Sequence, residues 1–109
     1  MIHLTSTKEW REALEESIVE VIVIFKHSNI CSASANIYTT LSKLEKSESF
    51  VAPIYYVTVQ DHRDISKEIA NDLGYNHETP QVFVVKNKKV IYVASQESIK
   101  IENIIEATT

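Results

Sequence analysis

The residue in this 109-residue chain with the strongest nucleophilic chemistry is Cys31, its only cysteine. Cys31 follows the apolar run Val21–Phe25 and precedes apolar residues at helical spacing, so it is expected at or just before the first turn of a helix. The free N–H groups and the dipole of a helix N-terminus stabilise a thiolate, which is the nucleophilic form of cysteine. Lys26 and His27, just upstream, would add positive potential. Position alone leaves two interpretations open: a reactive thiol, or a small buried residue that is inert in the core.

Ser34 stands three residues after Cys31, where a dithiol oxidoreductase would carry its second cysteine. A hydroxyl cannot resolve a mixed disulfide, so a reacting Cys31 would stay capped until a second thiol arrives. The chemistry indicated is therefore monothiol exchange. Ser34 is either an ordinary first-turn residue or a hydrogen-bond partner of the thiolate. A single cysteine also excludes an internal disulfide and a cysteine-rich metal site.

Thr79 and Pro80 directly precede the apolar run that begins at Val82. A proline at the entrance of a strand is often a simple edge feature. A cis bond would instead direct the backbone of Thr79 toward an incoming extended chain, but cis bonds are uncommon and the residues alone do not support one here. The neighbouring His77 and Glu78 either form a loop pair or line the pocket of the cysteine.

A metal site is not predicted. His27 and Cys31 lie four residues apart, as two ligands on a helix would. The other histidines, His3, His62 and His77, do not complete a set with ligand spacing.

Apolar periodicity predicts four helices and at least four strands. The first half of the chain predicts a helix over Thr7–Ser17 behind the capping box Ser6–Glu9, a strand over Val21–Phe25, and a helix after Cys31 with core positions Ala33, Ile37, Leu41 and Leu44. A strand over Ile54–Val59 and a helix capped by Asp64 and ended by Gly74 follow. The last part predicts strands over Val82–Val85 and Val90–Val93 with Asn87 in the turn, and a helix with Ile101, Ile104 and Ile105 that is capped by Ser98.

This order predicts an α/β fold. A strand–helix–strand unit makes a right-handed parallel crossover, and the hairpin then adds two antiparallel strands. The result is a four- or five-stranded mixed sheet with helices on both faces, the thioredoxin arrangement. The count depends on a short edge strand at Ile2–Leu4.

Composition limits the classes of function. With 44% hydrophobic and 24% charged residues, residues 1–109 are expected to form one thioredoxin-like domain. The net charge is −4 and Lys and Arg form no block, so no nucleic-acid partner is expected. The only glycine, Gly74, excludes glycine-rich phosphate loops. The chain shows no signal-peptide pattern and no apolar run near the roughly 20 residues of a membrane span, so we expect a cytoplasmic protein without a membrane partner.

Three segments carry a resemblance to a known family. The segment Phe25–Ser28, followed by Cys31, resembles the KHS-x-x-C region of the bacillithiol-system redox proteins known as YtxJ or monothiol bacilliredoxins. Residues Val59–Ser66 and His77–Gln81 are similar to further segments of that family, and the resemblance spans about residues 20–94. Two departures are Ser32, where members often have proline, and Gln96, where a histidine often follows the Ala-Ser pair.

The resemblance implies a thioredoxin fold in which Cys31 is the active cysteine and Thr79-Pro80 is a cis-proline motif. The implied substrate is a mixed disulfide between bacillithiol and a client protein, with bacillithiol as thiol co-substrate and no tightly bound cofactor. Thr79 would offer backbone hydrogen bonds to the substrate. We further expect Lys26 to meet a carboxylate of the acidic small thiol. The expected substrate-binding residues are Lys26, His27, Thr79 and Pro80.

Two alternatives stay open at this point. One is a non-catalytic interaction module that keeps the fold and uses Cys31 structurally. The other is an iron–sulfur-binding monothiol protein, although Cys31-Ser32-Ala33-Ser34 lacks the glycine and aromatic residue of the Cys-Gly-Phe-Ser motif of that group.

Overall fold

A computed structural model describes residues 1–109, all of the chain. Its elements, in chain order, are β1 (Ile2–His3), α1 (Thr7–Val19), β2 (Ile22–His27), α2 (Ser32–Glu45), β3 (Ile54–Thr58), α3 (Arg63–Leu73), β4 (Gln81–Lys86), β5 (Lys89–Ser95), the short 3-10 helix η1 (Gln96–Ser98) and α4 (Ile101–Thr108).

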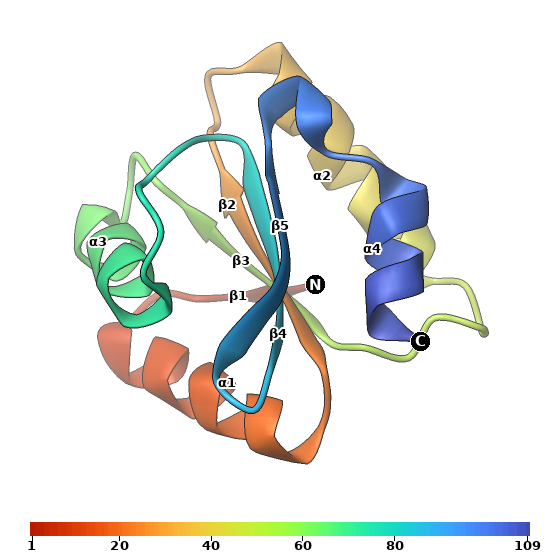
Figure 1. Cartoon of the computed structure of the whole chain (residues 1–109). Helices are drawn as coiled ribbons and strands as arrows, with labels where there is room; N and C mark the ends of the chain where they lie inside the picture. Colours follow the sequence, from red (N-terminus) through yellow and green to blue (C-terminus); the bar gives the residue numbers. More distant parts are fainter.

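The strands form one mixed sheet in the order β1-β3-β2-β4-β5 (Figure 1). β1, β3 and β2 are parallel, and β4 is antiparallel to both β2 and β5. The predicted mixed sheet is confirmed, and the edge strand brings the count to five through the pairs Ile2↔Tyr55 and His3↔Tyr56. The central β2 is buried from Ile22 to Lys26, as its unbroken apolar run indicated.

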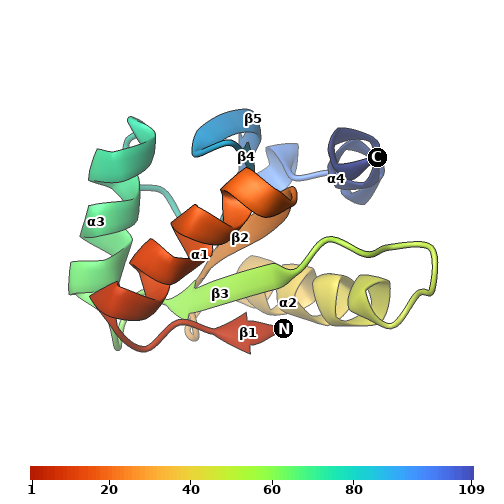
Figure 2. The same ribbon diagram turned by 90° about the horizontal axis from the view of Figure 1, so that it is seen from below.

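Helices cover both faces of the sheet. α1 and α3 lie on one side, and α2 and α4 lie on the other (Figure 2). Because strand side chains alternate between faces, Ile22 and Ile24 pack with the α1–α3 layer while Val23 and Phe25 pack with the α2–α4 layer. None of the helices has the length and apolar character needed to cross a membrane.

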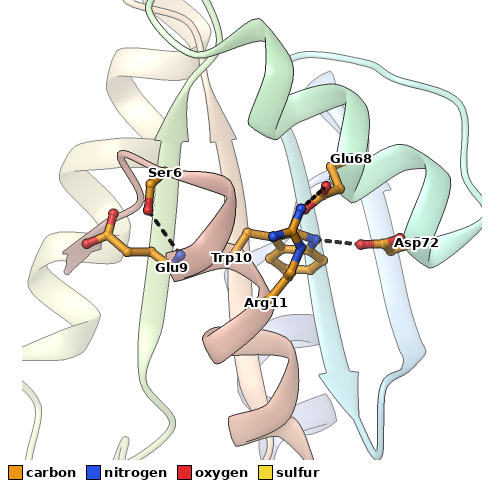
Figure 3. A network of polar contacts seen from close by, with 6 residues as sticks. All are labelled: Ser6, Glu9, Trp10, Arg11, Glu68 and Asp72. Atoms are coloured by element: carbon orange, nitrogen blue, oxygen red, sulfur yellow. Dashed lines mark hydrogen bonds and ion pairs between the residues drawn. The ribbon is translucent and has the colours of Figure 1, made fainter.

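The α1–α3 layer is fastened by polar contacts between the two helices (Figure 3). The indole N–H of the fully buried Trp10 donates to Asp72 Oδ2 at 2.8 Å. Arg11 contacts Glu68 at 3.0 Å. These contacts fix α3, and with it the loop that follows β3.

The predicted capping box is half confirmed. Ser6 Oγ accepts the N–H of Glu9 at 3.1 Å, as expected (Figure 3). The Glu9 carboxylate accepts the N–H of Thr5 at 2.8 Å, one residue before the position that a capping box requires.

Two predicted N-caps are wrong. α3 is preceded by His62 in the cap position, so Asp64 lies inside the first turn, where its charge still suits the helix dipole. Ser98 lies in η1, and Lys100 precedes α4. Gly74 ends α3 in the left-handed region at φ 76°, as predicted.

The β4–β5 hairpin is closed by a two-residue turn. Asn87 (φ 52°) and Lys88 (φ 63°) both take positive φ, which confirms the expectation for Asn87. The buried Ser17 of α1 ties this turn to the helix, because its carbonyl accepts the Asn87 N–H at 2.7 Å.

Candidate active site

Cys31 lies between the central strand and α2, as its surrounding pattern predicted. It occupies the N-cap position of α2 with extended backbone (φ −116°, ψ 122°), and its carbonyl accepts the Ala35 N–H at 3.0 Å. The side chain makes no capping hydrogen bond, and the residue is half-buried. The first turn of α2 holds no acidic residue. The sulfur therefore lies at the positive end of a 14-residue helix dipole without an opposing charge on that turn.

A groove of about 450 Å³ opens beside the thiol. It brings Cys31 together with Thr79 and Pro80, which are 48 and 49 positions away in sequence and which begin the segment leading into β4. The remaining lining residues are Ala33, Asn36, Ile37, Gln96, Glu97 and Ile99. Three of the five predicted site residues thus share one groove.

The Thr79-Pro80 bond is cis, as the resemblance implied. Pro80 is buried, and its carbonyl accepts the Gln96 N–H at 2.8 Å. Thr79 lies outside the strands, and its own N–H and C=O enter none of the hydrogen bonds that hold the turns and loops together. The residue opposite the cysteine therefore presents an unused backbone donor and acceptor at the groove.

His27 does not line the groove, although it is close in sequence to Cys31. Its Nδ1 lies 2.7 Å from Ser34 Oγ, which also accepts the N–H of Ser28 at 2.9 Å. Across this contact either the serine hydroxyl or the ring N–H donates, according to the histidine tautomer. Burial lowers the pKa of His27 below its ordinary 6.5, which favours the neutral ring. His27 holds the β2–α2 connection and does not line the groove, so its predicted substrate contact stays a prediction.

The structure shows which contacts the hydroxyl of Ser34 makes. It is fully buried, and its hydroxyl is used by His27 and Ser28, not by the thiol. The place of a second cysteine is therefore taken by a residue that fixes the loop. Gln60 fastens the same loop from the other side, because its amide contacts Ser28 Oγ at 2.8 Å and the Asn29 N–H at 3.1 Å.

Lys26 is not a surface ligand. The residue is 0% exposed, and its ammonium donates to His77 Nδ1 at 3.2 Å on the α3 side of the sheet. Burial lowers its pKa from 10.5 to about 8. The predicted contact with a carboxylate of the small thiol is wrong, because successive strand residues face opposite sides and Lys26 faces away from the groove. His77, the hydrogen-bond partner of Lys26 on that side, does not line the groove of Cys31 either.

Gln96 and Glu97 line the groove and were not among the predicted site residues. The backbone of Gln96 is in the left-handed region (φ 54°), which is unusual for a residue with a side chain. The sequence singled out Gln96 only as a departure from the histidine of the family, and no local pattern signals Glu97. Both belong to η1, which packs against α2.

Comparisons with known proteins agree with this geometry. A solved structure described as a candidate oxidoreductase with a thioredoxin fold matches with a TM-score of 0.87 and 29% identity, covering 99% of this chain and 93% of the other. Thioredoxin of Fasciola hepatica matches with a TM-score of 0.81 and 17% identity over 100% of both chains. Thioredoxin of Schistosoma mansoni matches with a TM-score of 0.79 and 19% identity, covering 99% and 97%. At these identities the two thioredoxins show the fold alone.

The family described as monothiol bacilliredoxin BrxC matches residues 2–104, nearly the whole chain. The predicted thioredoxin fold and the resemblance are both confirmed, and the single cysteine at the start of α2 is what a monothiol protein of this fold requires. The chain belongs to the monothiol bacilliredoxin family and is a thiol–disulfide oxidoreductase with a thioredoxin fold.

Proposed function

We propose that Cys31 removes bacillithiol, or a similar low-molecular-weight thiol, from mixed disulfides on client proteins. The thiolate of Cys31 attacks the sulfur of the small thiol, a new disulfide forms between them, and the client leaves as a thiolate that takes up a proton. A second molecule of small thiol then attacks the adduct, so that Cys31 is freed and a small disulfide is released. The electrons in this second step come from the small thiol.

The observation that carries the proposal is the pairing of a half-buried thiol with an unused backbone segment across one groove. An extended client chain would add to the N–H and C=O of Thr79, as an extra strand adds to a sheet edge. This contact would hold the client disulfide over Cys31. An inert core cysteine would need neither the groove nor the free backbone.

The absence of a second cysteine determines the sequence of the reaction steps. No thiol in this chain can displace the adduct from Cys31, so the small thiol stays bound until another thiol arrives from solution. The protein is then a carrier between client and reductant. We expect it to act on cytoplasmic clients, because free thiols persist in reducing compartments.

Transfer between defined partners tests the proposal. A client with one cysteine is first capped by bacillithiol, then mixed with this protein, and both are weighed by mass spectrometry. The mass of bacillithiol should leave the client and appear on Cys31, and C31S should leave the client capped. Because the chain has one thiol, any adduct on this protein lies on Cys31. Retention of the cap on the client with the wild-type protein would refute the proposal.

The same assay with glutathione and cysteine in place of bacillithiol identifies the preferred thiol. A rate at least tenfold higher for bacillithiol would support it as co-substrate. Equal rates for all three would leave monothiol exchange in place but overturn the assignment of bacillithiol.

A further inference from the structure

A second cavity lies on the α3 face, away from Cys31. Its volume is about 260 Å³, and it shares no lining residue with the groove of the thiol. We call it the α3 cavity, and it is lined by Val59, Arg63, Ser66, Lys67, Ala70 and His77.

The two side chains of fixed charge that line this cavity, Arg63 and Lys67, are both positive. Arg63 and Lys67 lie four residues apart on α3, so they project from the same side of the helix, and neither forms an ion pair. Like charges at this spacing repel each other, and no carboxylate lines the cavity to compensate them.

A third cation lies behind the wall of the cavity. The fully buried Lys26 ammonium donates to His77 Nδ1 at 3.2 Å, and Ser66 Oγ lies 3.0 Å from the same nitrogen. Lys26 has no acidic partner in any ion pair. Since Nδ1 of His77 accepts from an ammonium, the proton of the neutral ring is on Nε2, which can donate to a ligand.

Two acids of neighbouring segments make contacts outside the cavity. Glu68 of α3 contacts Arg11 of α1 at 3.0 Å, and Glu78 accepts a hydrogen bond from Ser95 at 3.1 Å. Neither lines the cavity. Glu78 offsets part of the positive potential at His77, whereas Arg63 and Lys67 have no carboxylate within ion-pair distance.

We propose that the α3 cavity binds a small oxyanion, a phosphate or carboxylate group of a metabolite. The planar guanidinium of Arg63 can hold two oxygens at once, Lys67 supplies a point charge, and His77 supplies a ring N–H. The volume admits an anion of about eight heavy atoms, at about 30 Å³ for each water-sized group. A nucleotide or a polymer end would not fit.

Titration with inorganic phosphate and with malonate tests the site. Backbone amide resonances are followed by NMR near neutral pH, and sodium chloride at matched ionic strength serves as the reference. We expect saturable shifts confined to residues 63–70 and 77, with a dissociation constant on the order of millimolar for at least one of the two anions. Saturation with phosphate alone assigns a phosphate ligand, and saturation with malonate alone assigns a carboxylate. Shifts no larger than those with chloride, for both anions, would overturn the proposal.

A matched pair of variants separates a site from general surface charge. R63Q/K67Q removes two exposed charges that line the cavity, and K86Q/K89Q removes two exposed, unpaired charges near the hairpin turn. The first should weaken anion binding at least tenfold, and the second should change it less than twofold. Equal weakening by both double variants would refute a defined site. All four positions are exposed, so both variants should fold, which circular dichroism verifies.

Discussion

Replacing Lys26 by methionine should stabilise the protein near neutral pH. The ammonium of Lys26 is fully buried without an acidic partner, and burial lowers its pKa from 10.5 to about 8. A pKa difference of one unit corresponds to 1.36 kcal/mol, so keeping this lysine charged costs the fold about 3 kcal/mol. Methionine fills a similar volume without a charge, but it loses the hydrogen bond to His77, which contributes about 1 kcal/mol. The net expected gain is about 2 kcal/mol.

The sign of the pH dependence follows from the lowered pKa. Below about pH 8 the lysine is protonated in both the folded and the unfolded chain, and the full cost of burial applies. Between about 8 and 10.5 the unfolded chain binds the proton more strongly than the folded one, so the wild-type protein gains stability as the pH rises. Above 10.5 the cost is gone. The advantage of K26M should therefore be largest near neutral pH and should vanish in strong base.

Urea denaturation of both proteins across this pH range measures the difference. Tyrosines that titrate in base affect both proteins equally, so the difference between the two isolates Lys26. K86M serves as the control, because Lys86 is exposed at the end of β4. A loss of stability in K26M near neutral pH, or a gain that does not change with pH, would refute the reasoning.

Three further changes test other parts of the structure. S34A removes a buried acceptor of the Ser28 N–H and should lower the free energy of unfolding by about 1–3 kcal/mol, measured in urea; an unchanged midpoint would mean that this contact contributes nothing. G74A places a side chain at φ 76°, where its Cβ meets no atom within 4 Å, so it should cost about 1 kcal/mol of backbone strain alone, read from thermal unfolding. E97Q removes a negative charge from the groove of Cys31 and should speed the reaction of the thiol with an anionic disulfide roughly two- to threefold at low salt. Stopped-flow kinetics would contradict this if the two rates were equal.

The architecture was predictable because its signals are local. The buried run of β2 and the two-residue turn at Asn87 are both complete within a few residues, and each reports on backbone conformation alone. Cys31 at the start of α2 followed from the same local order. The errors at the caps of α3 and α4 have the opposite cause. Asp64 and Ser98 are good cap residues, but the neighbouring elements fix where these helices begin.

Local order placed Cys31 at the start of α2, and only the family resemblance connected it with Thr79 and Pro80. The strand was predicted to end at Phe25, so the alternation of strand side chains was not applied to Lys26 and His27, which belong to the strand in the structure. Lys26 and His27 were therefore assigned to one site, whereas the structure places them on opposite faces of the sheet. The partner of Lys26 is His77, 51 residues away, and no local pattern connects the two.

This division of β2 explains how one strand serves two separate regions of the molecule. On the α2 side, His27 and Ser34 hold the loop that carries the thiol, and the place of a resolving cysteine is occupied by a hydroxyl. On the α3 side, Lys26 places a buried charge behind a positively charged cavity. The charge costs about 3 kcal/mol in a domain whose total stability is about 5–15 kcal/mol. For packing alone, an uncharged side chain at this position would give a more stable fold than lysine. A bound anion would offset part of this cost, so phosphate or malonate should reduce the stability advantage of K26M if the α3 cavity is occupied.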